Sequence, residues 1–147
     1  FPKAIQAILA AELIVVGPGS LYTSILPNLL VPDIAAAIRA SRALKVYICN
    51  LASSPGETQG FACGDFVQVI DSHVSGSIFD IVVSNNNYAD NLPEDAQWVK
   101  ADPEQDADFA LYLADLVDHE NPWRHDSGKL AQVLIDLYQE RTGPLVE

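Results

Sequence analysis

The sequence predicts an α/β fold, a Rossmann-like three-layer arrangement in which helices cover a mostly parallel sheet. Short apolar runs, typical of strands buried on both faces, recur at 13–16, 45–50 and 79–84. Segments with helical spacing separate these runs. Strands that alternate with helices in this way favour a parallel sheet with right-handed crossovers.

Composition and charge exclude several classes of function. The chain has 147 residues, of which 49% are hydrophobic, which is enough for the core of one domain. A formal net charge of −12 disfavours binding to nucleic acid or to an anionic membrane surface. No apolar run approaches the length of a membrane span. Cys49 and Cys63 lack the spacing of metal ligands, which favours a reducing, cytoplasmic location.

The first third of the chain predicts a helix, a strand, a tight turn and further helices. Residues 1–11 place apolar side chains on one helical face, and the buried strand 13–16 follows. The strand stops at the glycine–proline–glycine turn 17–19, and helical spacing resumes at Ser24. Pro32 then restarts the helix in the first-turn position, where proline fits.

Two later segments predict amphipathic helices with recognisable ends. We expect Asp65 to cap the first of them. The second has an apolar stripe across residues 130–138, a cap at Asp126 or Ser127, and a stop at Gly143-Pro144.

The region between these helices is less regular. Residues 96–100 predict a short strand, and residues 110–116 predict a further strand. The acidic run 102–108 lacks the mid-loop glycine of a calcium-binding loop, and Leu113 stands where the bidentate glutamate would be. We therefore interpret this run as a solvated loop.

The turn after the first strand has the features of a phosphate site. Glycine lets the backbone approach a ligand, and the N–H groups at a helix N-terminus favour an anion. Such a turn should lie at the carboxyl end of a central parallel strand, with its N–H groups unpaired within the protein. The alternative is a tight strand–helix connection without a ligand. The candidate residues, which include the potential helix caps Ser20 and Thr23, are Gly17, Gly19, Ser20, Leu21, Thr23 and Ser24.

Two more polar loops follow predicted strands and should reach the same edge of the sheet. The first offers amide, carboxylate, hydroxyl and glycine groups that could recognise a base or a sugar, although a solvated loop with a type II turn at Pro55-Gly56 is the simpler explanation of this loop taken alone. The second is a run of asparagines, which are also common turn formers. The candidate binding residues in these loops are Asn50, Gly56, Glu57, Thr58, Asn85 and Asn86.

A third candidate precedes the last helix. Arg124 can clamp a pyrophosphate through two parallel hydrogen bonds, and His125 can donate another. The alternative is a salt bridge at the start of the helix, for example with Asp126. No nucleophile–base set and no pair of catalytic carboxylates can be recognised from the sequence, so no catalytic residue is assigned.

Several stretches resemble one known family. The sequence LIVVGPGSLYTSILPNLLVP at 13–32 is similar to the signature of the YvcK-like gluconeogenesis factors, which are relatives of the CofD phospholactate transferases. The stretches 45–50, 55–58 and 124–131 stand in the same order as in that family. One departure is Gln59, where the family often has aspartate.

The resemblance implies a Rossmann-like fold and a bacterial protein about twice as long, of which residues 1–147 are the C-terminal half of one CofD-like domain. The first glycine-rich nucleotide loop would lie in the absent N-terminal half. It also implies a cytoplasmic regulatory protein that binds a UDP-sugar such as UDP-N-acetylglucosamine and acts in carbon metabolism, cell shape and envelope synthesis. CofD-like members instead transfer a phospholactyl group from a guanosine nucleotide to a deazaflavin, so magnesium is expected only for a transferase-like member. Homodimer formation stays open.

Overall fold

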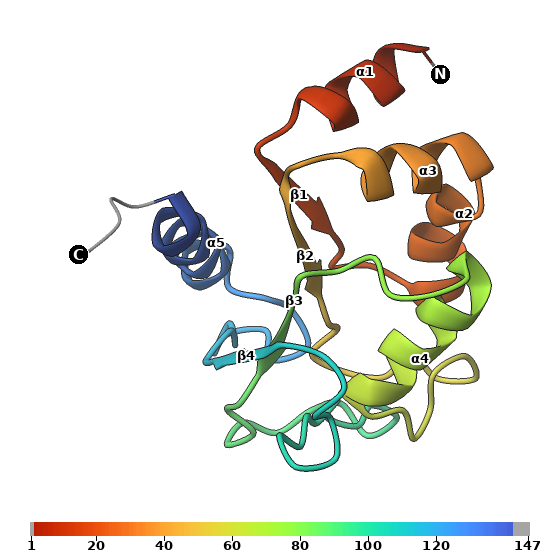
Figure 1. Cartoon of the computed structure of the whole chain (residues 1–147). Helices are drawn as coiled ribbons and strands as arrows, with labels where there is room; N and C mark the ends of the chain where they lie inside the picture. The colour runs from red at the N-terminus through yellow and green to blue at the C-terminus, as the bar shows by residue number, and fades with distance from the viewer. Residues whose placement is uncertain (1, 143–147) are drawn as a thin grey trace.

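Four parallel strands form one sheet in the computed structural model, which describes residues 2–142 (Figure 1). The strands lie in the order β1-β2-β3-β4, so each pairs with its neighbour in the sequence. Leu13 lies opposite Leu44 in the first pair, and Val82 lies opposite Leu111 in the last. In chain order the elements are α1 (Pro2–Ala10), β1 (Leu13–Val16), η1 (Leu21–Ile25), α2 (Leu26–Leu29), α3 (Pro32–Ala40), β2 (Leu44–Ile48), α4 (Cys63–Val74), β3 (Ile81–Asn85), β4 (Leu111–Ala114) and α5 (Ser127–Thr142).

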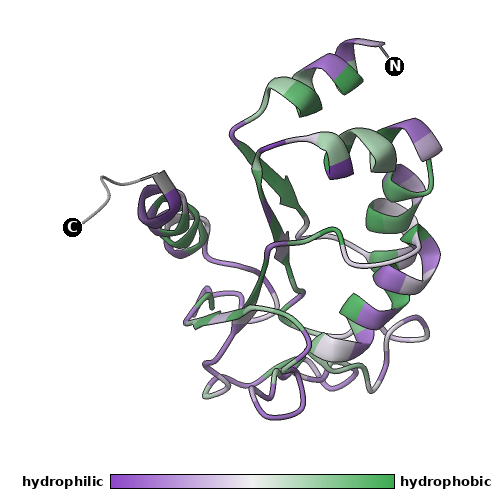
Figure 2. Ribbon diagram, in the orientation of Figure 1, coloured by the Kyte–Doolittle hydropathy of each residue, from purple (hydrophilic) through white to green (hydrophobic). Residues whose placement is uncertain are grey.

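Helices cover both faces of this sheet, as the sequence predicts. Elements η1, α2, α3 and α4 pack on one face, and α5 packs on the other (Figure 1). Successive side chains of a strand point to opposite faces, so Tyr47 of β2 belongs to the first core while Val46 and Ile48 belong to the second. Figure 2 shows strands that are largely hydrophobic and helices that carry both hydrophobic and hydrophilic residues. The strands are not uniformly apolar, since β2 includes Lys45 and β3 ends with Ser84 and Asn85. The α/β prediction is confirmed.

Two helix starts differ from the expectation. The helix after the glycine turn begins at Leu21 rather than at Ser24, and its first turn has π-helical hydrogen bonding. Ser20 occupies the cap position, but its hydroxyl makes no capping bond. Helix α4 begins at Cys63, so Asp65 is its third residue rather than its cap. The Asp65 carboxylate nevertheless accepts the N–H of Ala62 at 2.7 Å, which satisfies a backbone donor at the helix start.

The strand bounds also differ from the expectation. Strand β3 begins two residues later than the apolar run 79–84 and ends one residue beyond it, at Asn85. Strand β4 is confined to Leu111–Ala114 and is shorter than the predicted 110–116 at both ends. Residues 96–100 form no named strand. Trp98 nevertheless forms an isolated antiparallel bridge with Ala52, and the Val99 N–H donates to the Leu51 carbonyl at 2.9 Å. This segment pairs with the loop after β2 rather than extending the parallel sheet.

The last helix follows the prediction at its start. The Asp126 carboxylate accepts the N–H of Lys129 at 2.9 Å and thereby caps α5. The predicted stop at Gly143-Pro144 lies outside the described residues. Within residues 2–142 no single helix has both the length and the apolar content of a membrane span. The segments 21–29 and 32–40 reach them only in combination, across a bend of 72°.

Candidate functional site

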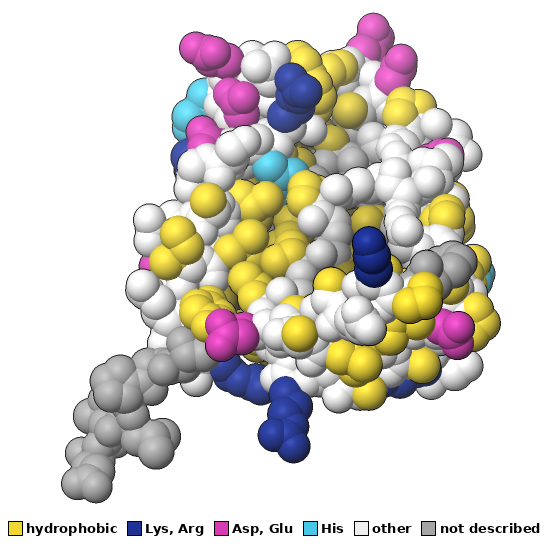
Figure 3. Space-filling view, turned by 90° about the horizontal axis from the view of Figure 1, so that it is seen from above, with side chains coloured by type: hydrophobic (Ala, Val, Ile, Leu, Met, Phe, Trp, Pro, Cys, Tyr) yellow, Lys and Arg dark blue, Asp and Glu magenta, His cyan; other side chains and the backbone are white. Residues whose placement is uncertain are grey.

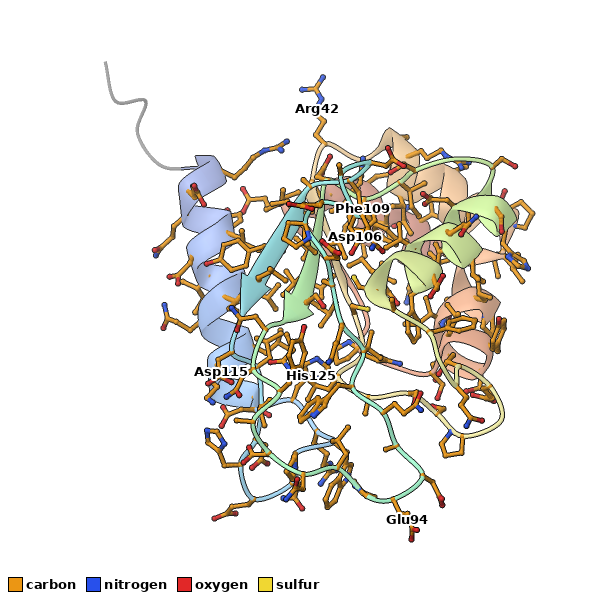
Figure 4. The ribbon with its side chains drawn as sticks, turned by 90° about the horizontal axis from the view of Figure 1, so that it is seen from below. Arg42, Glu94, Asp106, Phe109, Asp115 and His125 are labelled. Carbon is orange, nitrogen blue, oxygen red and sulfur yellow. The ribbon has the colours of Figure 1, made fainter. Side chains whose placement is uncertain are left out.

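A cleft of about 950 Å³ opens where β1 and β2 end. The cleft is lined by the glycine turn, the loop after β2, part of loop 91–97 and the loop before α5. The space-filling view of Figure 3 shows a hollowed face with hydrophobic side chains inside it and a histidine and charged side chains toward one rim. In Figure 4, His125 lies beyond the carboxyl ends of the strands, while Arg42 marks the opposite edge of the sheet.

The glycine turn packs closely against the backbone at the end of β2. Gly17 has a φ of +86°, and a Cβ atom there would stand 2.8 Å from the Ile48 carbonyl oxygen. Any larger residue would therefore strain the turn and clash with β2. The peptide between Gly17 and Pro18 is cis.

The N–H groups of this turn only partly match the expectation. The Gly19 N–H donates to the side-chain oxygen of Asn50 at 3.2 Å, so it is paired within the protein. Among the described residues, no hydrogen bond uses the N–H of Ser20 or Leu21. In the described chain β1 is also an edge strand rather than a central one. An anion at this turn would meet the start of η1, with Asn50 holding the loop in place.

Arg124 sits in a loop closed by its own backbone. Val117 and His125 form an antiparallel bridge, and the N–H of Asp118 donates to the Arg124 carbonyl at 3.2 Å. No carboxylate among the described residues forms an ion pair with Arg124, so the salt bridge to Asp126 is not seen. The exposed guanidinium lines the cleft.

The Asp118 carboxylate lies beside this arginine. Its pKa is below the ordinary value, chiefly because it accepts the backbone N–H of Glu120, with a smaller contribution from the charge of Arg124. Asp118 and Asp95 both line the cleft. The site therefore combines one guanidinium with two carboxyl side chains, and an anionic ligand must bind at the Arg124 side.

His125 is a neutral polar group in the cleft wall. Burial lowers the pKa of its ring, and the backbone of Cys49 offsets that shift in part. Its Nε2 atom is buried and has no hydrogen-bond partner among the described residues. A buried ring nitrogen without a partner is a position where a ligand atom or a water can bind.

A lysine fixes the loop that carries Arg124. Lys129 of α5 donates to the Val117 carbonyl at 2.9 Å and to the Asp115 carboxylate at 3.0 Å. His119 in turn pairs with Asp90 at 2.7 Å. The loop before α5 is thereby tied to the helix and to the segment after β3.

The predicted site residues divide into two groups. The cleft lining includes Gly19, Ser20, Asn50, Arg124 and His125, with Gly17 forming the turn behind them. The remaining predicted residues do not line it. They are Leu21, which is fully buried in the core, Thr23 and Ser24, which are exposed on η1, together with Gly56, Glu57, Thr58, Asn85 and Asn86.

Two of the residues outside the cleft have structural roles. The Thr58 hydroxyl accepts the N–H of Ser54 at 2.8 Å and closes the turn after β2. The side-chain oxygen of Asn85 accepts the N–H groups of Asn87 and Leu116, both at 3.2 Å, so it joins β3 to the segment after β4. Both side chains are buried, and their polar atoms are used by backbone N–H groups of the surrounding loops.

The structure adds residues that the sequence reasoning missed. Trp123, Asp95 and Pro93 line the cleft. Trp123 could have been noticed because it directly precedes Arg124. The contribution of loop 91–97 had no local signal, because its proximity depends on how the long connection between β3 and β4 folds back. Among the described residues, no cluster of three or more His, Cys, Asp or Glu side chains could hold a metal ion.

Comparison with known proteins agrees with this architecture. A gluconeogenesis factor of Bacillus subtilis is 40% identical over 148 residues, covering 95% of this chain and 47% of that protein. One of Listeria innocua is 40% identical over 143 residues, covering 93% of this chain and 44% of that protein. The crystal structure of a UPF0052 family member from Bacillus halodurans matches with a TM-score of 0.81 and 33% identity, covering 92% of this chain and 46% of that one.

The match extends over nearly the whole chain but not over the whole of its relatives. The chain spans about half the length of the curated relatives it matches. The family model described as 2-phospho-L-lactate transferase CofD matches residues 1–141. Because this family model matches nearly the whole chain, and the fold agrees with that of a related structure, this chain belongs to the CofD family.

Proposed function

We propose that this chain forms part of a regulatory protein that binds a nucleotide-sugar, with a uridine diphospho-sugar as its ligand. The protein would act in the cytoplasm, in carbon metabolism and in cell shape and envelope synthesis. Two of its relatives are named gluconeogenesis factors, which supports a role in carbon metabolism.

The observation that carries the proposal is the convergence of polar groups in one cleft. Ser20, at the start of η1, and Arg124, before α5, come from opposite ends of the chain and line the same cavity. A helix N-terminus and a guanidinium are both groups that bind phosphate oxygens. Positioned together beyond the ends of parallel strands, they are suited to hold the two phosphates of a diphosphate.

A second function has a specific observation in its favour. The matching family model carries the description of a phospholactate transferase, so a transfer reaction between a guanosine nucleotide and a deazaflavin is the alternative. Phosphoryl-type transfer depends largely on positioning and charge stabilisation, so the lack of a legible nucleophile does not separate the two functions.

Binding and turnover distinguish these functions in the full-length protein. We expect UDP-N-acetylglucosamine to raise the thermal transition as its concentration increases, because a ligand that binds the folded state stabilises it. Chromatography should recover the nucleotide-sugar intact after hours. If the protein instead ignores uridine nucleotides and, with magnesium, transfers phospholactate to a deazaflavin, the regulatory function is wrong.

A further inference from the structure

Trp123 is a large aromatic side chain left half-exposed at the cleft. It lines the cavity beside Arg124, and 49% of its surface is exposed. Trp98, by contrast, packs against the Tyr88 ring at a centroid distance of 5.9 Å. Trp123 makes no contact with another aromatic ring among the described residues. An exposed indole beside a guanidinium is a feature of binding surfaces rather than of solvated loops.

The backbone beneath Trp123 is fixed before any ligand arrives. The N–H of Arg124 donates to the Asn121 carbonyl at 2.8 Å, and the N–H of Asn121 donates to the Asp118 carbonyl at 3.1 Å. The Val117–His125 bridge closes the same loop. A ring held on such a loop loses little conformational freedom on binding, which favours affinity.

The side chains expected to recognise a base lie elsewhere. Gly56 and Glu57 are exposed and do not line the cleft, and the Thr58 hydroxyl is used by the N–H of Ser54. Trp123 is the large aromatic side chain in the described lining. Every nucleobase has a face that can stack on an aromatic ring, so Trp123 supplies a contact that those residues do not.

We propose that Trp123 is a stacking platform for the nucleobase of the ligand, next to the phosphate contact of Arg124. The inference rests on the proposed function, because it concerns the same cleft. The base then binds at the loop before α5, and the sugar contacts the other walls of the cleft. Asp95, which also lines the cleft, is available to accept hydroxyl hydrogen bonds.

The test compares ligands with and without a base in the full-length protein. Calorimetry would measure the affinity of uridine diphosphate and of inorganic pyrophosphate for wild type, Trp123→Ala and Trp123→Phe. We expect Trp123→Ala to weaken uridine diphosphate binding on the order of 5- to 100-fold and to leave pyrophosphate binding unchanged. Trp123→Phe should retain most of the affinity. If Trp123→Ala does not fold, Trp123→Leu removes the ring while keeping an apolar side chain.

The matched control is Tyr22→Ala. Tyr22 is 42% exposed on η1 but does not line the cleft, so its loss should change neither affinity. Unchanged uridine diphosphate affinity in Trp123→Ala, or an equal loss for both ligands, would overturn the stacking role. If the wild type binds uridine diphosphate and pyrophosphate with equal affinity, the base makes no contact and the stacking role is wrong, although the cleft would still bind phosphate. A wild type that binds neither ligand would overturn the proposed function itself.

Discussion

At the scale of single residues, the cleft depends on one guanidinium in an acidic protein. The chain has eight Lys and Arg residues against twenty Asp and Glu, so long-range attraction does not bring an anion to it. Arg124 is exposed and near Asp118, which weakens its local field. Its contribution to binding must therefore come from short-range, charge-assisted hydrogen bonds rather than from steering.

We expect Arg124→Ala to weaken binding of a uridine diphospho-sugar to the full-length protein by about 1.5–3 kcal/mol, the scale of a hydrogen bond to a charged group. Calorimetry measures the difference. Arg42→Ala is the matched control, because Arg42 is exposed at the opposite edge of the sheet (Figure 4). Equal affinities for Arg124→Ala and Arg42→Ala would show that the guanidinium does not contact the ligand.

At the scale of elements, helix ends and loops position the site. Asp126 caps α5 directly after Arg124 and His125, so the start of this helix and the cleft wall share a backbone. Lys129, three residues later, holds the Val117 carbonyl at the other end of the same loop. Stability of the first turn of α5 is thus coupled to the geometry of the Arg124 loop.

Asp126→Ala should lower the free energy of unfolding by about 0.5–2 kcal/mol, because the N–H of Lys129 loses its capping partner. Urea denaturation of the wild type and the variant measures this change. Glu140→Ala is the control, since Glu140 is exposed in the last turns of the same helix, and it should cost less. A loss no greater than that of Glu140→Ala would remove the capping role.

Much of this element structure follows from local sequence patterns. The apolar runs predicted the strands β1, β2 and β3, because the strands of a sheet with helices on both faces are mostly apolar, and Asp126 is a cap in both the prediction and the structure. The start of η1 was misplaced because Ser20 makes no side-chain cap, so propensity alone could not locate it. The segment 96–100 has strand-like residues but pairs with the loop after β2, which no local pattern encodes.

The candidate site was predictable to a lesser degree, for a physical reason. Residues beside a strand end, such as Gly19 and Asn50, reach the cleft because parallel strands end at one edge. Residues a few positions further along, such as Glu57 and Asn86, do not, because a turn directs them away. Asp95 reaches the cleft only through the folding of the long connection between β3 and β4, which lies beyond any pattern of spacing.

At the scale of the whole molecule, the cleft lies beside an open edge of the sheet. Within the described residues β1 pairs with β2 alone, and Val15 on that edge strand is 38% exposed. Since the chain spans about half of its relatives, we expect the remainder of the longer protein to cover this edge and supply a second wall. Measurements of binding therefore belong to the full-length protein.

We propose that the glycine turn and the Arg124 loop hold one ligand between them. Hydrogen–deuterium exchange of the full-length protein, with and without saturating UDP-N-acetylglucosamine, tests it most directly. We predict that the ligand slows exchange in peptides covering 17–24 and 117–127 together, while peptides from the far end of α5 stay unchanged. If the ligand saturates the protein but slows exchange in neither cleft segment, the ligand does not bind between the glycine turn and the Arg124 loop.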